Sequence, residues 1–411
     1  MASSKTFEFF SLLILSMQIL ISAGCTDVRP CDCTTQKMLN RKVERIVSCR
    51  YRNLSHVPNL KYRNFSLPVT SLELNFNHIT TIDRFSFEGM SIKEINLDNN
   101  PIRRIDAEAF AGIDGLQKLS MVKCRMNAFP VVFQHTPNLT RLDLRQNFIT
   151  NIPDGAFMSV RNLDRLDISF NPLTLTSASF RGLENSLTSI CLQGTRLRDV
   201  PRESLSPLRS LDWIDLSYNS ILYLDNDSLA GLPNNKHTHY GFSSNGMSSI
   251  SDAAFANASL PIFVDLSSNN LTSVNFVTDP CRFEHSTLYL DDNPIHCGCE
   301  LYDLLKYETF TVRGVCHTPD EFERYDLLFN KHIFQPFVIP FLRYASKKCG
   351  GNKVLGMDYD CDCKIWRKPR DFMKMRGNCT AYKFVESGAT VFKIPDFFCS
   401  ALMLALFVNI Y

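Results

Sequence analysis

The stretch Leu163–Leu173, which reads LDRLDISFNPL, decides the fold of this 411-residue chain. Its apolar residues and its asparagine follow the pattern L-x-x-L-x-L-x-x-N-x-L. Leu166 and Ile168 alternate with polar residues, which predicts a short β-strand whose other side chains, such as that of Arg165, point away from the core. The Asn171 amide is expected to bond to the backbone of the following turn, because a buried turn would otherwise leave polar groups unpaired.

The same pattern recurs along the chain at a nearly constant interval of 23 to 26 residues. The asparagine position is occupied in order by Asn77, Asn100, Cys124, Asn147, Asn171, Thr195, Asn219, Asn245, Asn269 and Asn293. About ten residues after this position comes another apolar anchor, which is Phe87, Phe110, Phe133, Phe157, Phe180, Leu205, Leu229 or Phe255. We expect these anchors to stack as a second spine under the outer side. One repeat cannot cover its own apolar face, but a stack of ten can.

This spelling and this period resemble the leucine-rich repeat. The resemblance implies an α/β repeat solenoid: a curved horseshoe with a parallel β-sheet on its concave face and disulfide-bonded caps at its ends. About ten repeats would occupy residues 69–293. Extracellular members of this family, such as Slit, the Nogo receptor and the Toll ectodomains, bind other proteins in adhesion, guidance, matrix assembly or recognition.

Composition and the first residues agree with an extracellular protein. A formal net charge of +2 argues against a nucleic-acid partner, which would require a basic field. Fifteen cysteines favour an oxidising compartment, where disulfides persist. Residues 1–24 read as a secretory signal peptide, with Lys5, an apolar run over 9–21 and small residues before Cys25.

Twelve of the cysteines form three groups of four, which predict cysteine-rich modules at 25–68, 294–349 and 350–399. Spacing alone allows three connectivities in each group. The family resemblance implies the pairs Cys25–Cys33 and Cys31–Cys49 in an N-terminal cap, and Cys297–Cys316 and Cys299–Cys349 in a C-terminal cap, although the interval from Cys316 to Cys349 exceeds the family pattern. The last group resembles a second, repeat-free copy of the C-terminal cap, with Cys361–Cys379 and Cys363–Cys399. Cys124 fits as a buried substitute for asparagine, and Cys191 and Cys281 receive no role.

The end of the chain leaves two alternatives open. Residues 400–411 are an apolar tail that is too short to span a bilayer. It reads either as part of a lipid-anchor signal that is cleaved off, or as the end of the second cysteine module, which needs Cys399. The chain would touch a membrane only through such an anchor.

Seven N-x-[S/T] sequons predict glycosylation. They lie at Asn53, Asn64, Asn138, Asn226, Asn257, Asn270 and Asn378.

The chain offers no recognisable catalytic chemistry. Hydrolase, zinc-protease and phosphate-binding motifs are absent from the sequence, so we predict that the protein is not an enzyme and needs no cofactor. His237 and His239 could lie on one strand face as metal ligands, but His237 falls on a core leucine position, so a misfit in a weak repeat is the preferred interpretation and no metal site is predicted.

The predicted concave face therefore holds the candidate binding residues. Aspartates such as Asp143 and Asp167 recur in its middle column, which we interpret as the family's usual spelling. The preceding column is less stereotyped and contains Lys118, Arg141, Arg165, Trp213, His239 and Phe263. Arginine and tryptophan are frequent anchors of protein interfaces, and these residues should become neighbours when the repeats stack. The alternative is a solvated basic stripe with aromatic residues shielded by loops.

These observations predict a non-enzymatic extracellular module that binds a protein ligand through its concave face, as a surface receptor or co-receptor. A secreted matrix or scaffolding protein is the alternative, and an inhibitor of a secreted enzyme is a third. The predicted location is extracellular, either secreted or attached to the outer cell surface. The ligand and the oligomeric state do not follow from the sequence.

Overall fold

The structure is a computed structural model that describes residues 29–37, 43–60, 69–226, 228–233, 235, 237–256, 258, 261–278, 283, 285–297 and 310–318, and the strands at 358–360 and 365–367. The signal segment and the apolar tail lie outside these residues. So do the predicted glycosylation sites Asn64, Asn257 and Asn378, and the cysteines Cys25, Cys281, Cys299, Cys349, Cys361, Cys363, Cys379 and Cys399.

Each repeat contributes a three-residue strand whose central side chain is buried. In β9 (Arg165–Asp167), Leu166 is 1% exposed between a half-buried Arg165 and a buried Asp167. The strand is short because Asn171 turns the chain shortly after it. The Asn171 amide donates to the carbonyls of Ile168 and of Leu144 in the preceding repeat, at 2.9 and 3.0 Å, so it binds two repeats together.

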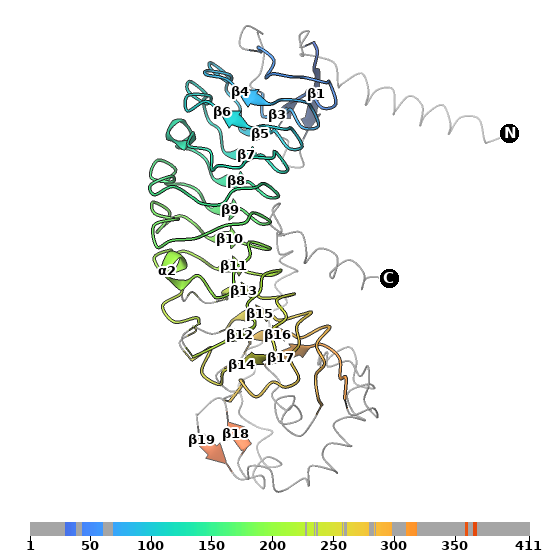
Figure 1. Cartoon of the computed structure of the whole chain (residues 1–411), viewed down its shortest axis with the longest axis vertical. Coiled ribbons are helices and arrows are strands. Elements are labelled where there is room, and N and C mark those ends of the chain that lie inside the picture. Colours follow the sequence, from blue (N-terminus) through green and yellow to red (C-terminus); the bar gives the residue numbers. More distant parts are fainter. Residues whose placement is uncertain are drawn as a thin grey trace, which may run out of the picture. The chain divides into compact units, whose positions relative to one another are not determined.

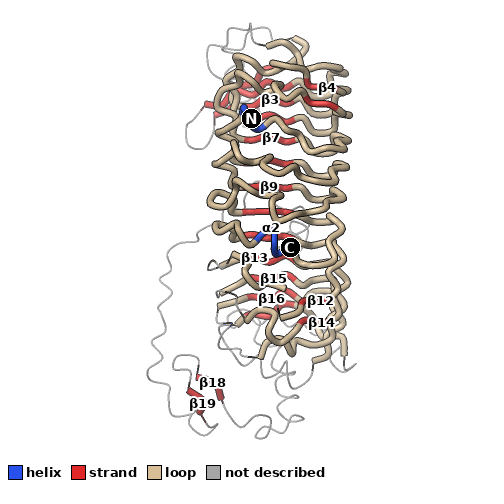
Figure 2. Tube along the Cα trace, turned by 60° about the vertical axis from the view of Figure 1, so that its left-hand side comes forward, coloured by secondary structure: helices blue, strands red, loops and turns tan. Residues whose placement is uncertain are grey.

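The chain forms two compact units. Unit 1 comprises Met1–Ile190 with Glu203–Ser210, and unit 2 comprises Cys191–Arg202 with Leu211–Tyr411. The boundary falls in β10 (Ser189–Cys191) and in the short helix α2 (Arg202–Leu205). Figures 1 and 2 show the same turn stacked repeatedly, with successive strands side by side within each unit.

The sheet of unit 1 has the strand order β1-β2-β3-β5-β7-β8-β9, antiparallel between β1 and β2 and parallel elsewhere. A second, parallel pair joins β4 and β6. The elements not yet given are β1 (Asp32–Lys37), β2 (Val43–Ser48), β3 (Ser71–Glu73), β4 (Thr81–Ile82), β5 (Glu94–Asn96), β6 (Arg104–Ile105), β7 (Lys118–Ser120), the 3₁₀ helix η1 (Phe133–His135) and β8 (Arg141–Asp143).

The sheet of unit 2 is parallel in the order β11-β13-β15-β16-β17, and a smaller parallel pair joins β12 and β14. Its elements are β11 (Trp213–Asp215), β12 (Tyr223–Leu224), β13 (His239–Gly241), β14 (Ser249–Ile250), β15 (Phe263–Asp265), β16 (Thr287–Tyr289), β17 (Thr311–Arg313) and the antiparallel pair β18 (Asp358–Asp360) and β19 (Ile365–Arg367). Strand pairing thus continues from the last predicted repeat into the predicted C-terminal cap.

The predicted second spine is confirmed, because all eight of its residues are buried. Phe87 and Phe110 stack with ring centroids 4.9 Å apart, and Phe133 and Phe157 follow at 6.2 Å. Turns carry six of these eight residues, whereas Phe133 begins η1 and Leu205 ends α2. Adjacent turns pack closely at Gly182, which has φ of 102°. A side chain at this position would approach the Phe157 carbonyl oxygen to 2.9 Å.

The described cysteines have three different environments. Disulfides join Cys31 to Cys49 and Cys297 to Cys316, the two pairs that the family resemblance implies for these positions. Cys33 and Cys191 are also disulfide-bonded. Cys124 is a free thiol, and burial raises its pKa to about 12. Its Sγ contacts the Leu97 carbonyl oxygen at 3.3 Å, so it replaces the asparagine as the sequence predicts.

One core residue differs from the prediction. His237, expected at a core leucine position, is exposed with φ of 69°, and Thr238 is buried in its place. A threonine can be buried here because its Oγ1 donates to the Asn235 carbonyl oxygen at 2.7 Å, whereas burial of an imidazole would leave polar nitrogens to satisfy. The pairing of β13 with both neighbouring strands stays in register through this longest repeat.

No helix within the described ranges is long and apolar enough to cross a membrane.

Candidate functional site

The predicted binding residues occupy the first position of successive strands, and the structure places them in two groups. The basic row of unit 1 consists of Lys118, Arg141 and Arg165, which lie opposite one another on β7, β8 and β9. The aromatic row of unit 2 consists of Trp213, His239 and Phe263, which lie opposite one another on β11, β13 and β15. All six side chains are half-buried.

The basic row is accompanied by carboxylates. The Lys118 ammonium lies 2.6 Å from the Glu94 carboxylate on the neighbouring strand β5. Burial raises the pKa of Asp164, and the positive charges of Arg165 and Arg141 oppose that rise, so Asp164 lies within their field. The row is therefore a partly compensated set of charges and not an open cationic stripe.

The aromatic row is a continuous stack of three rings. The Trp213 and His239 ring centroids are 4.5 Å apart with planes inclined by 22°, and those of His239 and Phe263 are 4.4 Å apart at 9°. Burial, and to a lesser extent the charge of His237, lowers the pKa of His239 to about 4. His239 is therefore neutral at physiological pH and acts as the middle aromatic ring of the stack.

Two further residues extend this face of unit 2, and sequence reasoning did not select them. Tyr289 and Arg313 lie opposite each other on β16 and β17, with the guanidinium carbon 5.2 Å from the tyrosine ring centroid. Tyr289 stands at the strand position that aspartate holds in several other repeats. Arg313 falls beyond the predicted last repeat, so the repeat pattern carried no signal for it.

The aspartate column has the structural role that its regular spelling predicts. The Oδ1 atoms of Asp167, Asp215 and Asp265 each accept a hydrogen bond, at 3.0 Å, from the backbone N–H of the serine two residues later. Each aspartate thereby satisfies the N–H that follows its strand, a local side-chain-to-backbone bond typical of Asp-x-Ser turns.

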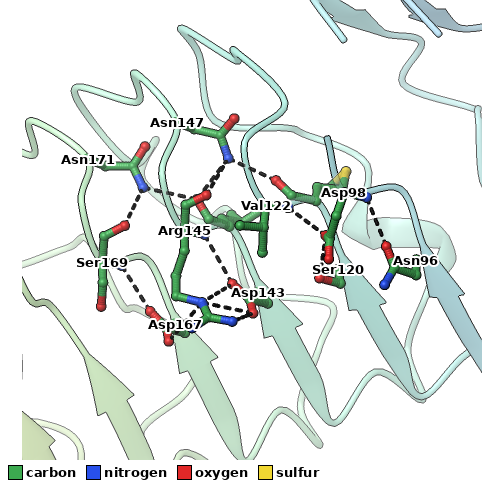
Figure 3. Close-up of polar contacts among 12 residues, drawn as sticks. Asn96, Asp98, Ser120, Val122, Asp143, Arg145, Asn147, Asp167, Ser169 and Asn171 are labelled. Atoms are coloured by element: carbon green, nitrogen blue, oxygen red, sulfur yellow. Dashed lines mark hydrogen bonds and ion pairs between the residues drawn. The ribbon is translucent and has the colours of Figure 1, made fainter. Parts of the chain in front are cut away.

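In unit 1 one arginine changes this arrangement. Arg145 follows Asp143 at the position where a serine follows the column's other three aspartates, and Figure 3 shows its guanidinium between two aspartates. Its Nη2 lies 2.7 Å from Asp143 Oδ2, and its Nε lies 3.0 Å from both Asp143 oxygens and 3.4 Å from Asp167 Oδ2. The sequence signal for this cluster is Asp143-Leu144-Arg145, which reads Asp-x-Arg instead of the more frequent Asp-x-Ser. This signal was not among the features from which binding residues were predicted.

The two aspartates of this cluster are almost fully buried. Burial raises the pKa of Asp143, and Arg145 opposes the rise. Burial and the neighbouring Asp143 charge raise the pKa of Asp167 to about 7. Asp167 Oδ2 has no hydrogen-bond partner, which explains why the single arginine does not hold both carboxyls ionised.

In unit 2 the corresponding space is filled without a cation. The Asp215 carboxylate accepts from Gln193 Nε2 at 2.7 Å, and Gly241 on the neighbouring strand leaves room for it. A side-chain carbon at Gly241 would lie 2.7 Å from Asp215 Oδ1. This glycine is therefore required by a close approach rather than by backbone conformation.

The histidine pair consists of an exposed His237 and a half-buried His239. Within the described ranges, no group of three or more histidine, cysteine, aspartate or glutamate side chains could hold a metal ion. His237 instead lies near Phe263, with ring centroids 6.3 Å apart.

The four predicted glycosylation sites that the structure describes, Asn53, Asn138, Asn226 and Asn270, are all exposed.

Comparisons with known proteins identify the repeats. A family model described as "BspA type Leucine rich repeat region" matches residues 55–186 in six copies, and one described as "Leucine rich repeat" matches residues 185–237. Bovine keratocan is 28% identical over 276 residues, which cover 64% of this chain and 72% of keratocan. Human Toll-like receptor 3 is 29% identical over 152 residues, which cover 33% of this chain and 17% of the receptor.

Among solved structures, a chain of the mouse RP105/MD-1 complex aligns with a TM-score of 0.54 and 17% identity, covering 71% of this chain and 54% of that one. At this identity the likeness shows the fold alone. The relatives are extracellular matrix or cell-surface proteins. Residues 55–237 of this chain are therefore leucine-rich repeats, and disulfides lie on both sides of them.

Proposed function

We propose that this chain is an extracellular protein-binding module that acts in recognition or adhesion, as a surface receptor or co-receptor, through the exposed face of its strands. The aromatic row Trp213–His239–Phe263 is the observation that carries the proposal. Three stacked rings on a sheet face form a rigid apolar surface, and aromatic residues dominate the binding energy of many protein interfaces. Tyr289 and Arg313 on the next two strands add a polar edge to this surface.

The basic row of unit 1 is the second candidate contact. Its cations are paired within the fold, as Lys118 is with Glu94, so their contribution to binding would be specificity and rate of association more than affinity. The relatives support a protein ligand in general terms, because they include matrix proteins and receptors.

The test compares two double variants with the unmodified protein. Trp213→Ala/Phe263→Ala removes the outer rings of the stack, and Arg141→Glu/Arg165→Glu reverses two charges of the basic row. Proteins captured from extracellular fluid by the unmodified chain should be lost or reduced with both variants, while secretion stays unchanged.

A matched control is Leu222→Ala/Tyr223→Ala, because these two residues are each 55% exposed and Tyr223 belongs to the separate β12–β14 pair rather than to the larger sheet of unit 2. The control should capture the same proteins as the unmodified chain. Equal capture by both strand-face variants would place the ligand elsewhere.

The alternative function is that of a secreted matrix or scaffolding protein, which the match to keratocan over 72% of its length favours. A phospholipase specific for lipid anchors separates the two. Release of the protein from intact cells supports a surface receptor or co-receptor. Recovery of the protein in the matrix, with Tyr411 present at its C-terminus, supports the alternative.

A further inference from the structure

Near the N-terminal end of unit 1, an aromatic pair lies open on the surface. Tyr51 is 64% exposed, the highest value among the described large apolar side chains. Its ring stacks on that of Phe76, with centroids 4.7 Å apart and planes inclined by 11°, and Phe76 is itself 39% exposed. The Arg50 guanidinium carbon is 5.8 Å from the Tyr51 centroid, so it lies at the outer limit of a cation–π contact and leaves most of the ring accessible.

The turn that carries Tyr51 is held firmly. The backbone N–H groups of Arg52 and Leu54 both donate to Oδ1 of the buried Asn77, at 2.9 and 3.1 Å. Tyr51 and Asn53, on either side of Arg52, both have φ of 54°, a conformation that non-glycine residues seldom adopt. Asn77, the first of the repeated asparagines, thus fixes the positions of Tyr51 and Asn53 relative to each other.

Asn53 is the acceptor of the sequon Asn53-Leu54-Ser55, and it is exposed two residues after the open tyrosine ring. An N-linked glycan begins with N-acetylglucosamine, whose ring presents a face of C–H groups. Such groups pack favourably on the electron-rich face of an aromatic ring. The chemistry of the open aromatic pair and that of the sugar next to it are therefore complementary.

We propose that the first sugars of the glycan on Asn53 pack on the Tyr51–Phe76 stack and cover it. The inference rests on the extracellular location in the proposed function, because N-glycosylation requires the secretory route. It assigns the pair an intramolecular carbohydrate contact that stabilises the N-terminal end of unit 1. Among the sequons that the structure describes, it distinguishes Asn53 from Asn138, Asn226 and Asn270.

Two of those sequons provide controls. Asn138 is preceded at the same distance by Thr136, which is 2% exposed, and Asn270 is preceded by Ser268. Neither has an exposed aromatic ring two residues before the acceptor. A glycan at these positions should act independently of Tyr51.

The experiment uses the full chain secreted from eukaryotic cells, with occupancy of Asn53 established by glycopeptide mass spectrometry. Melting temperatures are measured for the unmodified chain, Asn53→Gln, Tyr51→Ala and the double variant. Loss of the glycan should lower the melting temperature in the presence of Tyr51 by about 2–4 °C more than in the Tyr51→Ala background, the size expected for one surface contact.

Three measurements sharpen the outcome. Tyr51→Phe should retain the effect, since it keeps the ring. Enzymatic trimming to a single N-acetylglucosamine should also retain it, and Asn138→Gln should have the same effect in both backgrounds. In NMR spectra, the N-acetyl methyl protons of the Asn53 glycan should be shifted by the ring current and return to ordinary values in Tyr51→Ala.

An unoccupied Asn53 would overturn the proposal, and so would an equal effect of glycan loss with and without Tyr51. Binding of a protein partner to the bare Tyr51–Phe76 pair would do the same. The strand-face variants leave this pair intact, and Tyr51→Ala leaves the aromatic row intact. Failure of one proposal is therefore distinguishable from failure of the other.

Discussion

The strand faces of unit 1 and unit 2 have the same backbone but different chemistry. In unit 1 the first positions of β7, β8 and β9 carry cations, and Arg145 lies between the buried Asp143 and Asp167. In unit 2 the same first positions carry the stacked rings of Trp213 and its neighbours. Half-buried charges on a sheet require oppositely charged partners within the fold, whereas aromatic rings are stabilised by stacking on one another.

The difference teaches where binding energy is available. Glu94 and Asp164 already lie near the cations of unit 1, so a ligand there must replace or share existing interactions. The aromatic row of unit 2 has no such charge to compensate, and a ligand would gain apolar burial directly. We therefore expect unit 2 to provide most of the affinity and unit 1 mainly selectivity.

The largest effect should come from breaking the charge cluster of unit 1. Arg145→Met leaves two buried carboxyls without a cation, which is expected to lower the free energy of unfolding by about 3–5 kcal/mol at neutral pH. Urea denaturation measures the loss, and Asp143→Asn/Asp167→Asn in the same chain should restore much of it. The matched change in unit 2, Ser217→Ala, removes an Oγ that accepts from the Ser243 N–H and hydrogen-bonds the Asp215 carboxylate, and should lower stability by about 2 kcal/mol because no cation is lost. Equal losses for the two substitutions would contradict the charge-cluster interpretation.

The next effect concerns Gly241, which stands in β13 at the strand position that Asp215 and Asp265 hold in the neighbouring strands. Gly241→Ala places a methyl group 2.7 Å from Asp215 Oδ1 and is expected to lower stability by about 1–3 kcal/mol through overpacking. Hydrogen exchange of β11 and β13 amides locates the loss. Ser120→Ala, at the same strand position in unit 1, adds no atoms and loses a 2.6 Å bond to Asp98, so it should cost about 1 kcal/mol. An unaffected Gly241→Ala variant would show that the neighbouring strands can separate freely.

A pH titration should also isolate the contribution of Asp167. The folded pKa of Asp167 is raised to about 7, above its unfolded value, so the folded state binds more protons between about pH 4 and pH 7. Its contribution therefore makes the protein more stable as the pH falls through this window, by up to about 1.4 kcal/mol per pH unit. Asp167→Asn should flatten that dependence in unit 1. An unchanged slope in the variant would assign the pH dependence to other groups.

The smallest effect is expected at His239. Its folded pKa is lowered to about 4, so it favours the fold above pH 6.5 and loses that contribution as the pH falls from about 6.5 to 4, opposite in sign to Asp167. His239→Phe keeps the stack and should change stability at pH 7 by less than about 1 kcal/mol. The variant should resist acid better than the unmodified chain. Thermal melts at pH 7 and pH 5 test both statements, and a large loss at pH 7 would mean that the imidazole nitrogens matter.

Much of this architecture could be predicted because its determinants are local and repeated. The positions of Leu166, Asn171 and Phe180 recur at fixed offsets in each repeat. The strand, the row of repeated asparagines and the second spine therefore all follow from the 23- to 26-residue period. The stacking of Trp213 on His239 was also predictable, since equal positions in adjacent repeats become neighbours. His237 shows the limit: in a longer repeat the choice between two adjacent residues depends on which one can satisfy its polar atoms.

The charge cluster shows a second limit. Each of Asp143, Arg145 and Asp167 could be read from the sequence, but their protonation depends on burial and on distances between repeats, which a linear pattern does not contain.

By itself, the sequence determined the repeating turn, the register of the strands and the residues available on their face, because these depend on spacing and on the side-chain alternation of a strand. Only the tertiary structure decided that His239 is a neutral ring, that Arg145 joins two carboxyls and that Tyr51 lies open beside Asn53. Those properties arise from desolvation and from contacts between neighbouring repeats, which the repeat pattern does not contain.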